Sequence, residues 1–240
     1  MGTLSGLVVA QSPHGHPAAE LAPPARVAAA ATLVLGSGCQ AIAFLLIPSI
    51  DDSTAWLTWI AENETRGQLS KMFDVLAMPF LVGAAAVYIM LGRKQSPKLA
   101  WIGGIGLGSG LVGLAMLQGW EVLAYNLVVD DAASPETVAS AVDGITSSPA
   151  GIAVLVLFMV LGFGGLLVTL MSLWRSQVVP RAAVLLLLIG FVVDAFIAPV
   201  EGHVIMFLAA SWIAFTVLRA RPLGGDQYSP DSTTSRTRAL

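Results

Sequence analysis

Long apolar stretches run through most of this chain, and charged residues, prolines or polar loops separate one stretch from the next. A helix that rises 1.5 Å per residue needs roughly 20 apolar residues to cross about 30 Å of hydrocarbon. The predicted membrane spans are residues 27–47, 72–91, 100–120 or slightly beyond, 150–174, 182–198 and 203–218. The pattern therefore indicates an all-α fold, a polytopic transmembrane bundle of six helices.

The last two of these segments belong to one apolar run. A single helix over residues 182–218 would be about 55 Å long, which is too long for one crossing of the bilayer. The segment 198–202, with the sequence APVEG, lies in the middle of this run. Because proline and glycine both interrupt helical hydrogen bonding, we expect a tight hairpin there that divides the run into two spans.

Basic residues are distributed unevenly about the predicted spans. Lys and Arg next to span ends are retained on the cytoplasmic side of a membrane. Arg66 and Lys71 fall on one side of the predicted bundle, and the other ten of the twelve basic residues fall on the opposite side. Both termini are therefore expected in the cytoplasm, in a multi-pass protein of a bacterial plasma (inner) membrane.

The two ends of the chain differ from the apolar region. Residues 1–26 are rich in Pro, Gly and Ala, and residues 221–240 are polar with further Pro and Gly. Such sequences bury too little apolar surface to offset the conformational entropy lost on folding. We expect two disordered cytoplasmic tails, 1–26 and 221–240, on either side of a transmembrane domain of residues 27–220.

Two long loops, 51–71 and 130–148, fall on the outer side of the predicted bundle, and each contains signals for a short amphipathic helix. In the first, Trp59 and Ile60 follow Trp56 at spacings i+3 and i+4 on one face, which suits a helix at the level of the lipid headgroups. In the second, Ser134 resembles an N-cap before a proline and an apolar stripe. These helices either seal the outer end of the bundle or cover a site beneath them.

Composition agrees with a membrane protein and excludes several other classes. Hydrophobic residues make up 56% of the chain and charged residues 11%, which is too few charges for an ordinary soluble surface. A net charge of -3 gives no basic surface for nucleic acid. One cysteine excludes an intramolecular disulfide. The predicted partner is the lipid bilayer, and a membrane-protein partner or a homo-oligomer stays open.

Glycines are concentrated in the third span, where they form the small-xxx-small pairs Gly104/Gly108 and Gly106/Gly110. Small residues let transmembrane helices approach closely, so we interpret these glycines as a packing surface, with the glycines of the fourth span as its partner. A nucleotide-binding glycine loop would require a preceding strand, and these glycines lie inside an apolar helix.

Polar and ionisable side chains within the spans are few, and those with ionisable groups all fall in or near the outer half of the membrane. On the third span, Gln118, Glu121 and Tyr125 lie at spacings i, i+3 and i+7 and share one helical face. A further polar residue, Gln40 in the first span, is interpreted as an interhelical hydrogen-bonding residue. The candidate ion- or ligand-binding residues are Asp74, Gln118, Glu121, Tyr125, Asp194, Glu201 and His203.

Three interpretations of these outer residues stay open. The carboxylates can simply face the headgroups, cap helices or pair with His203, without any activity. Asp194 and His203 can form an ion or proton site. His203 with carboxylates can also hold a metal for hydrolysis, although a single histidine is a weak basis for zinc. The sequence assigns no metal, no cofactor and no catalytic residue.

The stretch from Arg66 through Asp74, Tyr88 and Leu91 to Leu99-Ala100, between a long outer loop and a third span, resembles the DUF4386-like bacterial six-helix membrane proteins. The resemblance covers most of residues 27–220 and rests on hydropathy layout and a loose residue pattern. It implies a six-helix fold. No activity is established for that family, so the resemblance transfers no catalytic residue.

The function that the sequence favours is that of a non-enzymatic membrane protein, with a structural, accessory or small-ligand- or ion-binding role and a polar pocket near the outer leaflet. The first alternative is a proton- or cation-coupled transporter of small molecules. The second is a metal-dependent membrane hydrolase.

Overall fold

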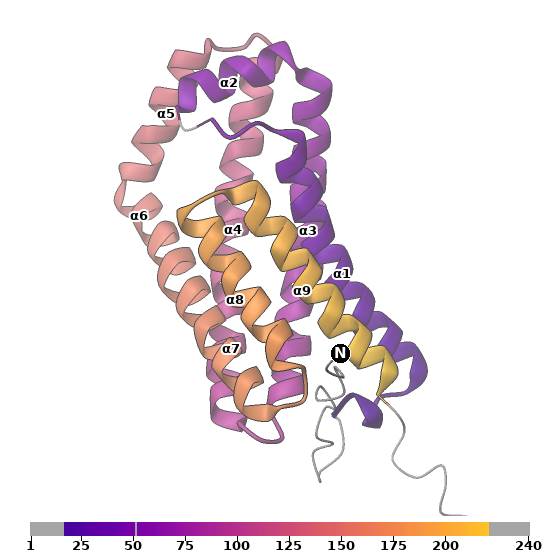
Figure 1. The fold of residues 1–240 in the computed structure, drawn as a ribbon. Coiled ribbons are helices and arrows are strands. Elements are labelled where there is room, and N and C mark those ends of the chain that lie inside the picture. The colour runs from indigo at the N-terminus through magenta and orange to yellow at the C-terminus, as the bar shows by residue number, and fades with distance from the viewer. Residues whose placement is uncertain (1–16, 51, 221–240) are drawn as a thin grey trace, which may run out of the picture.

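The computed structural model describes residues 17–50 and 52–220, and these residues form helices and no strand (Figure 1). Within them, five helical segments are long and apolar enough to cross a membrane. These are α1 (Pro23–Leu46), α3 (Glu64–Gly92), α4 (Pro97–Val129), the continuous stretch Pro149–Ser176, and α9 (Pro199–Arg219). The chain is thus an all-helical, multi-pass membrane protein. The predicted fifth span is α8 (Arg181–Phe196), which has 16 residues.

The stretch Pro149–Ser176 is not the regular helix that the hydropathy pattern predicts. It consists of α6 (Pro149–Val156), the π-helical segment η2 (Leu157–Phe163) and α7 (Gly164–Ser176). A π-helix is wider than an α-helix because its hydrogen bonds connect residues five apart, and such segments are frequent at functional sites. The turn therefore widens halfway along this helix.

The N-terminal boundary of the bundle lies earlier than expected. A 3-10 turn, η1, covers Pro17–Glu20, and α1 begins at Pro23 because proline presets the first turn of a helix. The guanidinium of Arg26 donates a hydrogen bond to the carbonyl of Ala220, just after α9. Residues 17–26 therefore belong to the folded part and not to a disordered tail, whereas the remainder of the predicted tails, 1–16 and 221–240, lies outside the described residues.

The hydrogen bond from Arg26 to Ala220 also shows how the two ends of the described chain are arranged. The start of α1 and the end of α9 lie together at one end of the bundle, as Figure 1 shows. We call it the basic end, since the basic residues in and beside the α3–α4 and α7–α8 connections also lie there. Side by side around the bundle, α8 packs on α9, α9 on α1, α1 on α3, α3 on α4, and α4 on η2 and α7.

At the opposite end, α2 (Ser53–Glu62) and α5 (Pro135–Ser147) form a cap over the bundle (Figure 1). Both short amphipathic helices predicted for the loops are confirmed. The Asp52 carboxylate accepts a hydrogen bond from the Ala55 N–H at 2.7 Å and caps α2, and Ser134 caps α5 as expected. Buried side chains from both helices pack with one another and with the end of α4. We call this the capped end.

The two long helices that carry the cap, α3 and α4, extend beyond the boundaries predicted for their spans. Helix α3 begins at Glu64 and not at residue 72, so Arg66 and Lys71 lie in the helix and not in a loop. Helix α4 continues to Val129, well beyond residue 120. The polar residues that end the apolar run are compatible with a helix, because hydropathy marks the part of a helix that faces hydrocarbon and not its full length.

The expected glycine surface is present between α4 and the helix of η2 and α7. A Cβ added at Gly110 would lie 2.0 Å from the Cα of Gly162, and one at Gly106 would lie 3.1 Å from the Cα of Gly165. The pair Gly106/Gly110 thus faces the glycines of the fourth span, as predicted. For the other pair the prediction is wrong in part, because Gly104 faces α3, and Gly108 has open space within the described part of the chain.

The predicted hairpin forms between α8 and α9. Only Ile197 and Ala198 connect the two helices, and the predicted turn residues after Ala198 form the first turn of α9. A Cβ added at Gly202 would lie 2.3 Å from the backbone nitrogen of Asp194. Gly202 therefore lets the two helices meet closely at the level of Asp194.

Candidate functional site

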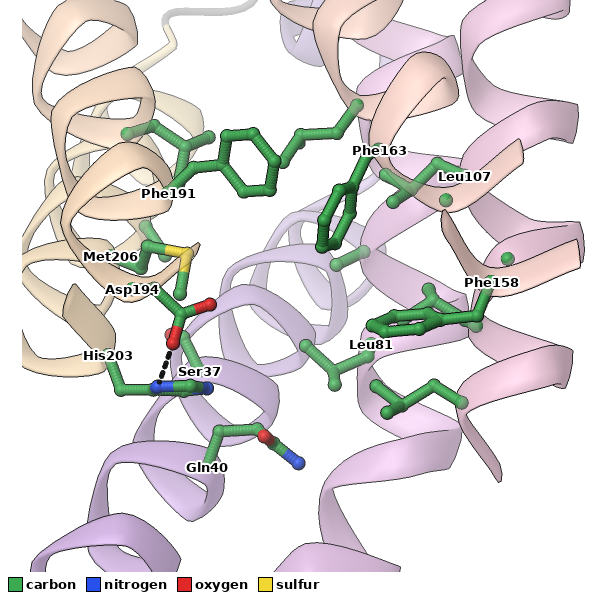
Figure 2. A pocket seen from close by; sticks show the side chains of 18 of the residues that line it. Ser37, Gln40, Leu81, Leu107, Phe158, Phe163, Phe191, Asp194, His203 and Met206 are labelled. Carbon is green, nitrogen blue, oxygen red and sulfur yellow. Dashed lines mark ion pairs between the residues drawn. The ribbon is translucent and has the colours of Figure 1, made fainter. Parts of the chain in front are cut away.

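A cavity of about 390 Å³ lies inside the bundle among α1, α3, α4, η2, α8 and α9 (Figure 2). We call it the central cavity. Most of its wall is apolar and includes the rings of Phe158 and Phe163 from η2 and of Phe191 from α8 on the opposite side. Phe163 meets Phe158 and Phe191 edge to face, with ring centroids 5.3 and 4.8 Å apart. The contact with Phe191 joins the π-helical segment to α8 across the cavity.

The π-helical segment explains how two of these rings share the cavity. Phe158 and Phe163 are five residues apart, and both line the central cavity together with Gly162 between them. In a regular α-helix, residues five apart point in clearly different directions, whereas the wider turn of a π-helix brings them toward the same side. The irregular geometry therefore gives the cavity its aromatic wall.

Five of the seven candidate residues line the central cavity, and two do not. The five that lie on its wall are Asp74, Gln118, Glu121, Asp194 and His203. The Tyr125 hydroxyl instead donates to the carbonyl of Glu64 at 3.1 Å and ties α4 to the start of α3. Glu201 is exposed in the first turn of α9.

Asp74 is the centre of a buried polar cluster on α3. One carboxylate oxygen accepts a hydrogen bond from the Gln40 amide at 3.0 Å, which confirms the interhelical bond expected of Gln40. The other oxygen lies 3.5 Å from the ammonium of Lys71, and Lys71 also forms an ion pair with Glu121. Asp74 and Lys71 are only 6% and 7% exposed. The buried carboxylate is therefore paired with a charge and a hydrogen-bond donor, as a charge in an apolar bundle requires.

Lys71 is the site residue that the sequence pattern does not reveal. On hydropathy it is only a basic residue of an outer loop, because the apolar run begins after it. Its spacing of three residues from Asp74 is the signal that could have identified it, since residues at i and i+3 are neighbours on a helix. Its ammonium also lies 5.1 Å from the centre of the Trp56 ring in the cap, within the range of a cation–π contact.

A second polar pair joins α8 to α9. The Nδ1 atom of His203 lies 3.0 Å from a carboxylate oxygen of Asp194 and 2.8 Å from the carbonyl of Pro199. Both neighbours are acceptors, so Nδ1 carries a proton and donates to them. The imidazole stacks on Phe44 with ring centroids 3.9 Å apart. Figure 2 shows the Asp194–His203 pair on the α8–α9 side of the cavity, away from the aromatic wall of η2.

Gln118 differs from these paired groups. It is only 6% exposed, and its side-chain oxygen has no hydrogen-bond partner among the described residues. A buried acceptor without a partner costs about 1 to 3 kcal/mol. Gln118 lines the central cavity, so its side chain is available to a hydrogen-bond donor that enters there.

A second hollow of about 250 Å³ lies on the capped side of the central cavity. We call it the cap-side hollow. Phe44, Asp74 and Glu121 line both spaces, whereas Lys71 and Trp56 line the cap-side hollow. The Asp74–Lys71–Glu121 bridge therefore lies where the two spaces adjoin.

The described residues contain no group of three or more His, Cys, Asp or Glu side chains that could hold a metal ion. His203, the weak metal candidate, has Asp194 as its single carboxylate partner in this part of the chain. The metal-hydrolase hypothesis therefore lacks a ligand set within the described ranges.

Comparisons of this chain with protein-family models, with curated proteins and with solved structures find no match. The resemblance to DUF4386-like proteins thus stays a prediction.

Proposed function

We propose that this chain is a six-span protein of a bacterial inner membrane, with both termini in the cytoplasm, and that it binds a small molecule in the central cavity. The lead hypothesis from the sequence included such a small-ligand-binding role. The capped end then faces outward, and the cavity lies toward the outer leaflet.

The arrangement of the ends supports an even number of spans. Arg26 at the start of α1 bonds to Ala220 after α9, so the two lie at the same end of the bundle. Helix α8 would be about 24 Å long at 1.5 Å per residue, somewhat short of the hydrocarbon thickness. It runs antiparallel beside α9 (Figure 1), so a chain that crosses in α9 must have crossed in the opposite direction in α8. The basic end is the cytoplasmic end by the rule for Lys and Arg.

The central cavity is the observation that carries the ligand-binding role. Small-molecule sites typically have volumes of about 300 to 1,000 Å³ and are lined by apolar and aromatic side chains with a few placed polar groups. The central cavity, at about 390 Å³, has this character, with its carboxylates, Gln118 and His203 as the polar groups. A purely structural role would require no such space inside the bundle.

Cysteine labelling tests whether the cavity can be reached from outside. In a Cys39→Ala background, Leu114→Cys places a thiol on the cavity wall, and Met116→Cys places one on the lipid-facing side of the same helix. We expect a membrane-impermeant cationic methanethiosulfonate, applied to spheroplasts, to label Leu114→Cys and not Met116→Cys, because thiols react as thiolates, which form in water and not in hydrocarbon.

Two controls make this experiment decisive. Ser134→Cys in the cap should react completely, and Ser96→Cys at the basic end should not react in sealed spheroplasts. If Leu114→Cys stays unlabelled while Ser134→Cys reacts, the cavity is closed to the outside and the proposed function fails.

A proton-coupled transporter is the second candidate, and the Asp194–His203 pair favours it. An imidazole bonded to a carboxylate on a cavity wall can exchange a proton with a bound molecule. Transport predicts that Asp194→Asn abolishes proton-driven uptake into liposomes without unfolding the protein. Unchanged uptake in this variant would contradict it.

A further inference from the structure

Hydrogen-bond acceptors outnumber donors among the polar groups on the central cavity. Gln118 presents an unpartnered oxygen, and Asp74, Glu121 and Asp194 add carboxylates that already have partners within the protein. The amide of Gln40 is already committed to Asp74, and the hydroxyl of Ser37 donates to the carbonyl of Leu33 at 2.7 Å. A ligand that satisfies the Gln118 oxygen must therefore supply a hydrogen-bond donor.

The charges on the cavity wall also favour a ligand that donates hydrogen bonds. Three carboxylates line the cavity, and the cation bonded to two of them is Lys71, which lies on the cap-side hollow. The cluster around Lys71 has two carboxylates, Asp74 and Glu121, for one ammonium, and so carries an excess of negative charge. Such an excess in an apolar bundle favours a positively charged ligand.

Lys71 shows that the carboxylates of Asp74 and Glu121 accommodate an ammonium group. Its ammonium lies between the carboxylates of Asp74 and Glu121 and near the ring of Trp56. A ligand ammonium in the central cavity would meet Glu121 together with Gln118, which lies three residues earlier on the same helix.

A bare metal ion fits the remaining wall poorly. Beyond the polar groups, the cavity is lined by aromatic and aliphatic side chains, among them Phe158, Phe163 and Phe191. An ion at the carboxylates would leave this space empty, whereas an organic ammonium with an apolar body fills both parts.

We propose that the ligand of the central cavity is an amphipathic primary or secondary amine, bound as its ammonium ion. The ammonium donates to the oxygen of Gln118 and to the carboxylate of Glu121, with Asp194 adding negative charge from the opposite wall. The apolar body packs against the aromatic wall of η2 and α8. This inference rests on the proposed function, since it names the class of molecule that the cavity takes.

Three small probes with the same phenyl body test the proposal on the wild-type full chain in nanodiscs. They are 2-phenylethylammonium, the neutral 2-phenylethanol and the quaternary trimethyl(2-phenylethyl)ammonium, used at equal concentration. A ligand that binds only the folded state raises the unfolding temperature. We expect the primary ammonium to raise Tm most, because the alcohol lacks the charge and the quaternary ion lacks the N–H donors that Gln118 requires.

Variants then locate the binding. Gln118→Leu and Glu121→Gln should each weaken binding of 2-phenylethylammonium about tenfold or more, the effect of losing a hydrogen bond to a charged group. Glu201→Gln is the matched control, because Glu201 is an exposed acid at the same end of the bundle, and its affinity should equal that of the wild type. Gln118→Leu removes an unpartnered buried acceptor, so this variant is expected to fold.

Each other outcome overturns the amine proposal. Equal stabilisation by the alcohol would indicate a neutral ligand, and equal stabilisation by the quaternary ion would exclude a donor to Gln118. The same rise with sodium chloride alone would indicate a bare cation, and no rise with any probe would reject the amine class. The cysteine labelling of Leu114→Cys decides separately whether the cavity itself is accessible, so the two failures can be distinguished.

Discussion

Lys71 is a buried cation that pairs with two carboxylates of unequal exposure. Its side chain and that of Asp74 are each 9% exposed, whereas the side chain of Glu121 is 48% exposed. Buried charges in a bundle are expensive unless paired, while a half-exposed partner is already solvated in part. The Asp74–Lys71 contact is therefore the part of the bridge that matters for folding, and Glu121, although paired with Lys71, is accessible enough to contact a ligand as well.

Replacing Lys71 with methionine should destabilise the protein. Lys71→Met leaves the buried Asp74 carboxylate with Gln40 as its bonded partner among the described residues, and removing one partner of a buried ion pair costs about 3 kcal/mol. Unfolding in mixed detergent–SDS micelles, followed by tryptophan fluorescence, measures this loss.

The double variant is the control for this prediction. Lys71→Met with Asp74→Asn removes both buried charges and should recover most of the stability, and Glu121→Gln alone should cost less than about 1 kcal/mol because that side chain is half exposed. A Lys71→Met protein as stable as the wild type would show that the buried pair is not required.

Among individual residues, the sequence predicted most of the polar side chains on the cavity wall but missed the cation, Lys71. Asp74, Asp194 and His203 were identifiable because an ionisable group within an apolar run needs a reason to be there. Lys71 lies just before such a run, where hydropathy cannot separate a solvated lysine from a buried one. Tyr125 shares a helical face with Glu121, but it lies a turn nearer the cap and bonds to Glu64 instead.

Among the helices, the contact between α4 and η2 allows a matched test on one helix. At Gly110 an added Cβ would lie 2.0 Å from the Cα of Gly162, whereas at Gly108 the described residues leave open space. We expect Gly110→Ala to destabilise the protein by about 1 to 3 kcal/mol, because the two helices must separate. Gly108→Ala should be neutral or stabilise by up to about 1 kcal/mol, because alanine favours the helix.

Unfolding of the two glycine variants under identical conditions checks this difference. The central cavity should also change in Gly110→Ala, because Gly110 and Gly162 line it. Equal stability of the two variants would contradict the close contact between α4 and η2.

Helix α5 in the cap should respond to pH at its N-terminus. The pKa of the Glu136 carboxyl lies below its usual value, because the carboxylate accepts hydrogen bonds from its own backbone N–H and from the Ser134 hydroxyl. A carboxyl with a lowered pKa in the folded state contributes stability above its unfolded pKa of about 4.3, and this contribution is lost as the pH falls through the folded value.

Hydrogen exchange of the first turn of α5 measures this effect. We expect the protection factors of the Thr137 and Val138 amides in the wild type to fall as the pH drops below the ordinary pKa range of a glutamate carboxyl. The Glu136→Gln variant has no carboxylate at this position and should show no such step. An equal fall of these protection factors in both proteins would show that the Glu136 carboxylate is not the cause.

The elements that the sequence could not predict have a common physical cause. The segment that contains η2 is apolar on all sides, so its pattern has no period that could reveal a change from α- to π-helical turns. The extension of α4 to Val129 was missed for the opposite reason, since Glu121 and Tyr125 end the apolar run although the helix continues. Cap helices α2 and α5, with clear polar and apolar faces, were predictable.

For the whole molecule, the sequence predicted an all-helical, multi-pass membrane protein, and the long apolar helices of the described residues confirm it. The contact of Arg26 with Ala220 agrees with the even number of spans that we propose. The decisive segment is α8, since its 16 residues make it shorter than the five long apolar segments of the described chain. Its length alone leaves the number of crossings at five or six.

Reporter fusions at the two ends of α9 test the crossing of α8. Alkaline phosphatase is active only outside the cytoplasm, and green fluorescent protein exported in unfolded form is fluorescent only inside it. We expect a phosphatase fused after Ala198 to be active, and a fluorescent protein fused after Leu240 to be bright, because α8 brings the chain out and α9 returns it. If α8 does not cross, the fusion after Ala198 is inactive and the C-terminus lies outside. Asp194 and His203 would then not lie toward the outer leaflet, and the proposed orientation would be wrong.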